Sequence, residues 1–289
     1  MNGPLSARQK GFWASNKWLL LRRGNQLAIL ALFLLGPLAG IWLIKGNLSA
    51  SLFLDTLPMS DPYLLLQVMF SGHLPESMAL IGGLIVLIFY LLVGGRSYCS
   101  WVCPLNIITD GASWLQRRWG IQPRGNLSRD LRFWLLGLSL LLALMGGSLL
   151  WELVNPVTLI QRGLIYGSVA VWGAVLALFL FELLVSQRGW CSHLCPTGAF
   201  YSLLTLRAPL RVSTPRRSAC DDCLDCFKVC PEPQIIKPVV KGEQGSSTII
   251  DSSVCTNCGR CIDVCNQHVF QFSTRFNRRE EPVNEENSS

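Results

Sequence analysis

Charged residues and histidine are scarce in this 289-residue chain, and both shortages narrow its possible functions. Only 15% of the residues are charged and half are hydrophobic, a balance too apolar for one soluble domain. The histidines are His73, His193 and His268, so no pair on facing helices can hold a haem, and no CxxCH motif for covalent haem occurs. No GxGxxG follows a predicted strand, so we expect neither a nicotinamide nor a flavin domain.

Long apolar stretches are abundant, and they predict four transmembrane helices at residues 27–44, 77–93, 133–153 and 164–185. About 20 apolar residues are needed for a helix to cross the hydrocarbon layer. Arg22 and Arg23 ahead of the first stretch resemble a twin-arginine export signal, but no small-residue cleavage site follows. We therefore expect an uncleaved anchor in an α-helical polytopic membrane protein.

Basic residues predict the orientation of these helices. If the helices cross in turn, 23 of the 25 lysines and arginines fall on one side, and only Lys45 and Arg162 fall on the other. Loops rich in lysine and arginine stay in the cytoplasm. We expect a bacterial inner-membrane protein with both termini in the cytoplasm and with Trp13 and Trp18 as interfacial anchors. The net charge of +7 then needs no nucleic-acid partner.

A repeat lies within this pattern, because the second and fourth apolar stretches end in the same motif at an offset of 92 residues. Each copy has arginine, an aromatic residue and CxxxCP, with the thiols at Cys99, Cys103, Cys191 and Cys195. The repeat predicts a duplicated helical hairpin. Two cysteines four apart share one helix face, and the proline that follows discourages the helix from continuing.

These four thiols allow three interpretations. They could converge to hold a metal or an additional iron–sulfur centre, they could act as a redox dithiol, or they could pack without a chemical role. A permanent disulfide is the least expected form, because the predicted location is reducing.

Two further runs of cysteine dominate the C-terminal region, with the spacing CxxCxxCxxxC repeated between residues 220 and 265. This spacing binds [4Fe-4S] clusters, and the fourth cysteine of each run ligates the other cluster. One cluster is predicted at Cys220, Cys223, Cys226 and Cys265, and the second at Cys255, Cys258, Cys261 and Cys230. Tetrahedral zinc is less suitable, because a zinc site closes with four ligands and needs no second interlocking run of four cysteines. A disulfide framework is less suitable because the predicted location is reducing.

This C-terminal region resembles the bacterial two-cluster ferredoxin domain. The short apolar runs at residues 210–213, 248–250 and 269–272 predict its strands. We expect an α+β ferredoxin-like domain that follows the membrane part, which gives four segments in all. They are a cytoplasmic segment at 1–26, the four-helix membrane domain at 27–201, the cluster domain at 202–276 and a disordered tail at 277–289.

Without haem or nicotinamide, a lipid-soluble quinol is the natural electron donor. Ionisable residues at membrane depth are candidates for the quinol site. Burying such residues in the membrane costs free energy, and they are therefore usually kept for a function. Glu182, Glu152 and His73 are weak candidates to accept a proton, with Glu76 beside them in sequence. Each could equally be paired, as Glu182 would be with Arg96 or Arg188.

With four apolar stretches, two CxxxCP motifs and the double cysteine run together, the chain resembles the NapH family of membrane ferredoxin-type proteins, to which NosR and oxidase-assembly proteins are related. The resemblance implies a component of a quinol dehydrogenase that works with an iron–sulfur partner similar to NapG and other electron-transfer subunits. Its electrons would pass toward a periplasmic nitrate reductase.

That resemblance leaves the electron route open, because the predicted clusters face the cytoplasm and the reductase lies outside. Electrons could recross the membrane through the CxxxCP region, or the clusters could serve input, assembly or sensing. Three hypotheses follow for the chain: an electron-transfer subunit, an assembly or metal-reducing factor for another redox enzyme, and an anchor whose clusters are structural.

Overall fold

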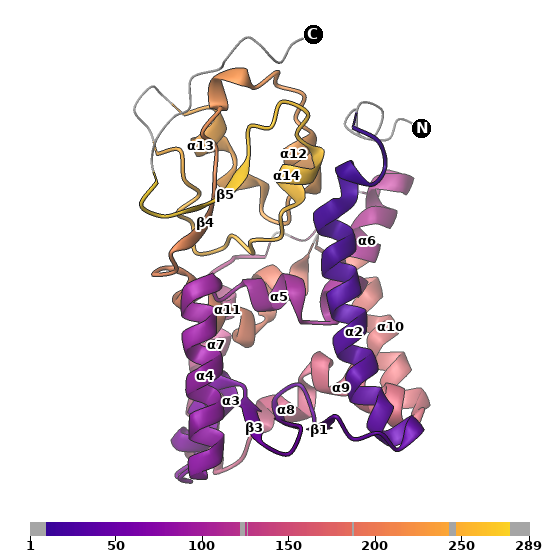
Figure 1. Cartoon of the computed structure of the whole chain (residues 1–289). Helices are drawn as coiled ribbons and strands as arrows, with labels where there is room; N and C mark the ends of the chain where they lie inside the picture. The colour runs from indigo at the N-terminus through magenta and orange to yellow at the C-terminus, as the bar shows by residue number, and fades with distance from the viewer. Residues whose placement is uncertain (1–9, 122–124, 126, 187, 243–246, 278–289) are drawn as a thin grey trace. The chain divides into compact units, whose positions relative to one another are not determined.

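The computed structural model describes residues 10–121, 125, 127–186, 188–242 and 247–277 (Figure 1). The chain divides into two compact units. The helical unit comprises Asn25–Phe89 and Val102–Tyr201, and the cysteine-rich unit comprises Met1–Gly24, Tyr90–Trp101 and Ser202–Ser289. The four predicted segments stay predictions, and all but the first residue of the predicted tail at 277–289 lies outside the described residues.

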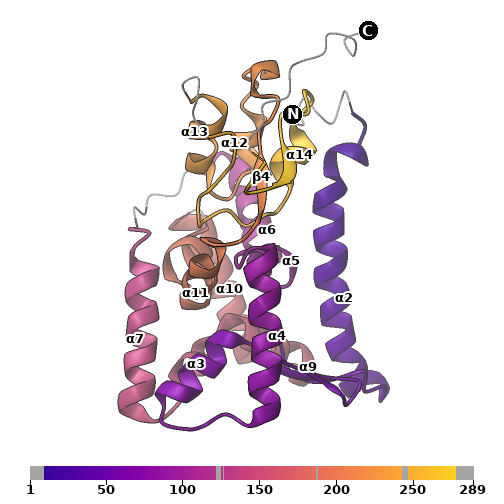
Figure 2. The same cartoon turned by 60° about the vertical axis from the view of Figure 1, so that its left-hand side comes forward.

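Helices form most of the helical unit (Figure 2). They are α2 (Lys17–Ala39), α3 (Pro62–Phe70), α4 (Ser77–Val93), α6 (Leu105–Trp119), α7 (Leu131–Gly146), α8 (Leu150–Val154), α9 (Pro156–Tyr166), α10 (Val169–Leu184) and α11 (Pro196–Thr205), with a π-helical turn, η2 (Trp190–Leu194). α2 begins in the cysteine-rich unit, α4 reaches into it at Tyr90, and α11 ends in it.

The helices match the four predicted spans only in part. Of the described helices, the stretch Ala14–Ala39 is long and apolar enough to cross a membrane, and α4, α7 and α10 are apolar but have 17, 16 and 16 residues. α4 coincides with the second predicted stretch. The third and fourth stretches were predicted too long, because Gly147 and Gly167 adopt φ of +56° and +64° and end α7 and α9. The first was placed too late, because the helix has already ended at Ala39.

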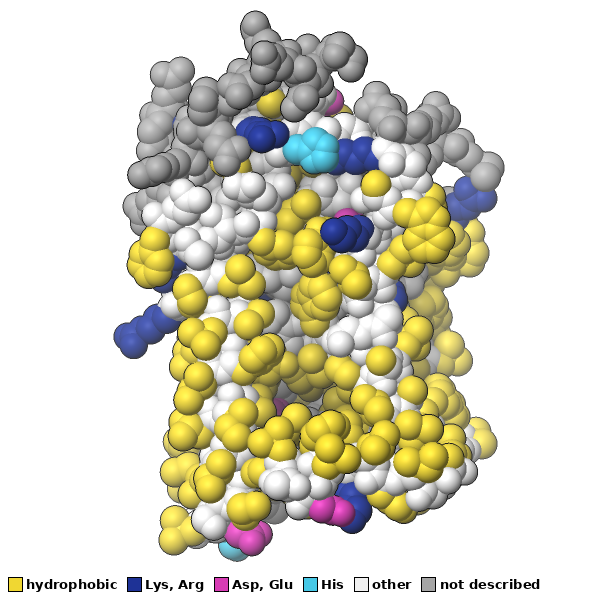
Figure 3. Space-filling view, viewed as in Figure 1, with side chains coloured by type: hydrophobic (Ala, Val, Ile, Leu, Met, Phe, Trp, Pro, Cys, Tyr) yellow, Lys and Arg dark blue, Asp and Glu magenta, His cyan; other side chains and the backbone are white. Residues whose placement is uncertain are grey.

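Hydrophobic side chains cover the outward faces of the apolar helices. In the face of the molecule drawn in Figure 3, hydrophobic side chains cover most of the helical region, and charged side chains lie mainly near the ends of the helices. Leu84 of α4, Leu144 of α7 and Leu176 of α10 are each more than half exposed. Contiguous apolar surface of this kind is rare on proteins that face only water.

The segment at residues 45–76, between the first two predicted helices, contains regular structure. β1 (Ile44–Gly46), β2 (Ala50–Phe53) and β3 (Leu57–Ser60) form an antiparallel sheet in the order β1-β2-β3. α3 follows directly, because the Asp61 carboxylate accepts a hydrogen bond from the Tyr63 N–H at 3.0 Å and Pro62 occupies the first helical position. The Asp-Pro pair is the sequence signal that predicts this helix start.

The 92-residue repeat corresponds to a repeated order of elements. α4, α5 (Ser97–Trp101) and α6 follow one another in the first copy, and α10, η2 and α11 do so in the second. In each copy a long apolar helix is followed by a short helical turn with the first cysteine, then the proline, then another helix.

The cysteine-rich unit is built on two antiparallel strands, β4 (Leu210–Ser213) and β5 (Gln271–Thr274), with Leu210 opposite Thr274. β4 has the predicted bounds, β5 begins two residues later than predicted, and the middle predicted strand is reduced to one bridge between Ser213 and Ile249. The remaining elements are η1 (Ala14–Asn16), α5, η3 (Arg217–Ala219), α12 (Asp225–Val229), η4 (Pro233–Ile235), α13 (Lys237–Val240) and α14 (Arg260–Val264). Its core includes Val212, Ile236 and Phe270.

Candidate metal centre

Two cavities in the cysteine-rich unit each have four cysteines in their walls. The first cavity is lined by Cys220, Cys223, Cys226 and Cys265, and the second by Cys230, Cys255, Cys258 and Cys261. In both, three cysteines come from one run and the fourth from the other run, which is the grouping that the spacing predicts. Valine, isoleucine and phenylalanine side chains form much of the remaining walls, which also contain Asp221 and Asp222 in the first cavity and Glu232 in the second.

The backbone turns around each cavity in the same way. Asp222 and Leu224 of the first run adopt φ of 55° and 60°, and the matching Asn257 and Gly259 adopt 48° and 71°. A left-handed residue on either side of the middle cysteine bends the chain, and the three cysteines of each turn line one cavity. Leu224 pays the steric cost of this conformation, which Gly259 avoids.

Burial raises the pKa of several of these thiols. Burial raises the pKa of Cys255 to about 11, although the charges of Arg211 and Arg96 favour its thiolate, and burial together with neighbouring thiols raises the pKa of Cys226 to about 12. Iron is compatible with this set because its charge compensates four thiolates, with release of the thiol protons. The four-sulfur donor set fits a [4Fe-4S] cluster in each cavity.

A buried ion pair lies beside the second cavity. Arg96, from the first CxxxCP repeat, donates to Glu232 Oε1 at 3.5 Å and to the Val254 carbonyl at 2.9 Å, and both side chains of the pair are 2% exposed. Glu232 and Val254 both line that cavity. The arginine of this repeat therefore has a structural partner near the cysteines.

The two cavities differ in exposure. Cys255, Cys258 and Cys261 are buried, whereas Cys220 and the other thiols of the first cavity are only partly buried. Leu224, in the wall of the first cavity, is 46% exposed. The first cavity is therefore the one nearer to solvent.

The N-terminal segment also supports these cysteines, which sequence reasoning missed. Asp263, between Cys261 of α14 and Cys265 just after it, accepts hydrogen bonds from the Trp18 and Leu19 N–H groups at 3.0 and 3.1 Å and so satisfies the free N–H groups at the start of α2. The Trp18 ring packs against Phe272 at a centroid distance of 4.9 Å. Trp18 is therefore not simply an interfacial anchor, whereas Trp13 is exposed.

The CxxxCP cysteines do not share a helix face as predicted. α5 ends at Trp101, before Cys103, and Cys195 is the extended residue that ends η2. The proline after each of them favours extended backbone at the cysteine and breaks the helix there. Among the described residues, no three His, Cys, Asp or Glu side chains are arranged to hold a single metal ion. The chemical role of these thiols stays a prediction.

The three candidates for quinol chemistry have different surroundings. Glu182 is 1% exposed and its Oε1 accepts from the Trp190 N–H at 2.8 Å, while no hydrogen-bond partner is found for its buried Oε2. Glu152 accepts from Ser49, Asn155 and Thr158 in a polar cluster. His73 is exposed.

Asp61 is a further acidic residue of the helical unit, partly buried, that sequence reasoning did not single out. Its Oδ1 accepts a hydrogen bond from the Tyr201 hydroxyl at 2.9 Å. Burial raises the pKa of Asp61 to about 6, against the lowering effect of these hydrogen bonds. The Arg188 guanidinium forms an ion pair with Asp110 and also lies close enough to Glu182 for its charge to act on that carboxylate, as expected.

Two interlocked sets of four cysteines beside an antiparallel strand pair define a ferredoxin-type protein with two iron–sulfur sites. In agreement, the family described as a 4Fe-4S dicluster domain matches residues 219–269, and the family described as a 4Fe-4S binding domain matches residues 77–122 and 164–212, where the CxxxCP motifs lie.

Relatives along nearly the whole chain narrow this class. The chain is 45% identical to the ferredoxin-type protein NapH of Haemophilus influenzae over 274 residues, which cover 95% of this chain and 96% of that protein. It is 50% identical to the methylamine utilization ferredoxin-type protein MauN of Paracoccus denitrificans over 271 residues, 94% of this chain and 95% of that protein. The chain belongs to this NapH and MauN family of ferredoxin-type electron-transport proteins. No solved structure matches it.

Proposed function

We propose that the chain is a membrane electron-transfer subunit that oxidises quinol and passes the electrons through two [4Fe-4S] clusters, held by the two sets of cysteines described above. The observation that carries this proposal is the convergence of two complete four-thiol sets in one small unit. Quinol gives up two electrons and two protons, and two one-electron centres can accept the electrons in turn.

Four membrane-spanning helices, α2, α4, α7 and α10, belong to the same proposal. The exposed leucines of α4, α7 and α10 support lipid contact, and the distribution of lysine and arginine supports a cytoplasmic location for both termini. At 16 or 17 residues the shorter helices are about 24 Å long, so thinning of the bilayer or flanking helical segments would complete the crossing.

The partner proposed for the clusters is an iron–sulfur protein similar to NapG, and the electrons are proposed to reach a periplasmic nitrate reductase. The first cavity is the better docking point, because its cysteines are nearer to solvent than those of the second. The relatives named for methylamine utilization are as similar as those named NapH, so the shared role is electron delivery and the terminal enzyme can differ.

A second candidate is an assembly or metal-reducing factor for another redox enzyme. The observation that favours it is that relatives named NapH and relatives named for methylamine utilization are about equally similar to this chain. An assembly factor could act on different redox enzymes in the same way. The test is rapid mixing of quinol with the anaerobically purified chain in liposomes, followed by the visible absorbance of the clusters. Fast bleaching supports quinol oxidation. No bleaching, together with a metal-deficient target enzyme in a deletion strain, supports the assembly role instead.

A further inference from the structure

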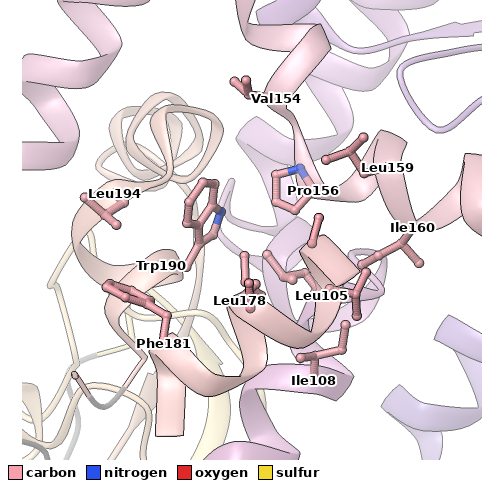
Figure 4. Close-up of a pocket in the computed structure, with 13 residues that line it drawn as sticks. Leu105, Ile108, Val154, Pro156, Leu159, Ile160, Leu178, Phe181, Trp190 and Leu194 are labelled. Atoms are coloured by element: carbon pink, nitrogen blue, oxygen red, sulfur yellow. The ribbon is translucent and has the colours of Figure 1, made fainter. Parts of the chain in front are cut away.

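An apolar cavity of about 470 Å³ lies within the helical unit (Figure 4). Residues of α6, α9 and α10 form most of its wall, and this volume is within the range that holds small organic ligands. Its lining is almost entirely aliphatic and aromatic, so the cavity suits a largely apolar molecule.

The second CxxxCP motif contributes to the wall of this cavity, and a residue that directly follows the first motif lies there too. Trp190 and Leu194, which precede Cys191 and Cys195 directly, lie in its wall, as does Leu105, two residues after Cys103. The π-helical turn η2 places Trp190 and Leu194 on the same side of the cavity (Figure 4). π-Helical turns are frequently found at functional sites.

Trp190 supplies the wall with one polar group. Its Nε1 is buried and has no hydrogen-bond partner. In Figure 4 the ring nitrogen is on the side of Pro156, across the cavity. The ring is stacked on Trp151 at a centroid distance of 6.3 Å, and the backbone N–H is fixed by Glu182. A buried indole N–H normally finds an acceptor, so this one indicates a ligand with a carbonyl or hydroxyl oxygen.

The cavity also has an open side made of small residues. Ala174 and Ala177 of α10 line the cavity and are themselves exposed. α10 is one of the apolar helices proposed to lie in the membrane, so this opening would face lipid. A molecule dissolved in the bilayer could reach the cavity there without passing through water.

The first copy of the repeat has a different aromatic residue at the position of Trp190. Tyr98 occupies the position that matches Trp190, and its ring packs edge-on against Tyr90 at 5.9 Å. The two copies have therefore diverged at this aromatic position.

We propose that this cavity binds the ring of a lipid-soluble quinone or quinol, with the Trp190 N–H donating to a ring oxygen and the apolar chain leaving past Ala174 and Ala177. The proposal rests on the proposed function, for which it names the substrate site. Trp190 is here a binding residue, and the aliphatic side chains exclude water from the ring.

The test is equilibrium binding of tritiated decylubiquinone, and of a decyl-tailed naphthoquinone, to the full-length chain in lipid nanodiscs. Ala177→Phe fills the opening and is expected to weaken binding more than tenfold. Trp190→Phe keeps a smaller aromatic ring but removes the N–H, and a three- to tenfold loss is expected from one hydrogen bond. Leu176→Phe, at an exposed position of α10 outside the cavity, is the control and should bind as the unmodified chain does.

Several outcomes would overturn the site. Unchanged binding in Ala177→Phe, with the visible cluster spectrum intact, would place the quinone elsewhere. Equal competition by decylbenzene, which has the tail but no ring oxygen, would show a general lipid cavity. If quinol reduces the clusters equally in the unmodified chain and in Ala177→Phe, the proposed function stands and this site fails. If the unmodified chain binds quinone but quinol never reduces the clusters, the site stands and the function fails.

Discussion

The buried pair of Arg96 and Glu232 permits a quantitative prediction. Replacement of Arg96 by methionine leaves the Glu232 carboxylate without its cation in a site where both side chains are 2% exposed. At a separation of 3.5 Å and an effective dielectric constant of about 20, the Coulomb attraction lost is roughly 5 kcal/mol. Breaking buried pairs by removing one partner costs about 3–5 kcal/mol. The Gln234 amide still donates to Glu232 at 2.8 Å, so we expect the lower end of this range.

The assay is urea denaturation of the anaerobic protein, followed by loss of the visible iron–sulfur absorbance. Arg96→Met should lower the unfolding free energy by about 3 kcal/mol, and the double variant with Glu232→Met should lose less than the two single variants together, since no charge is then left buried. Lys241→Met is the control, because it breaks an exposed pair with Asp222 at 3.1 Å and should cost less than about 1 kcal/mol. Equal losses in Arg96→Met and Lys241→Met, or strictly additive losses in the double variant, would refute the reasoning.

Further predictions concern the turns, the helix start and a partly buried acid. Leu224→Gly should stabilise the first turn by about 1 kcal/mol, because glycine adopts the positive φ without strain. Gly259→Ala should destabilise the chain, because the new Cβ would lie 2.6 Å from the Trp18 ring. Urea midpoints measure both effects, and a change of the same sign in both variants would contradict the prediction. Asp263→Ala should cost about 2 kcal/mol and speed hydrogen exchange at the start of α2; unchanged exchange there would argue against the cap. The pKa of Asp61 is raised, so the folded state binds a proton more tightly than the unfolded state does, and stability should fall by on the order of 2–3 kcal/mol between about pH 4 and pH 7. Asp61→Asn should remove that component from the pH profile of the unfolding free energy, and an unaltered profile would show that another group is responsible.

Local spacing predicts the cysteine-rich unit well, for a physical reason. Three thiols at every third residue are a spacing typical of [4Fe-4S] ligands, so the spacing alone predicts which cysteines belong together; cluster binding by these sets stays a prediction. The structure places Cys265 with the first run and Cys230 with the second, as the spacing predicts. The first strand, at residues 210–213, was also predicted with its bounds.

Contacts between distant parts of the chain could not be predicted in this way. Arg96 and Glu232 are 136 positions apart, and Trp18 and Asp263 are 245 apart, and no local pattern links either pair. The prediction that the CxxxCP cysteines share a helix face was wrong, because proline disfavours helical backbone at the residue before it. The extended backbone of Cys195 shows this effect. The Trp190 cavity depends on the packing of three helices, and a single tryptophan among ten gives no sequence signal.

The most direct test of the central claim is electron paramagnetic resonance of the anaerobically reduced chain, with iron and acid-labile sulfide measured on the same samples. The account predicts two [4Fe-4S] signals, one lost in both Cys220→Ser and Cys265→Ser and the other lost in both Cys255→Ser and Cys230→Ser. Loss of signals grouped by run, so that Cys265→Ser matches Cys255→Ser, would contradict the crossed arrangement. A chain free of iron and sulfide would contradict the whole account.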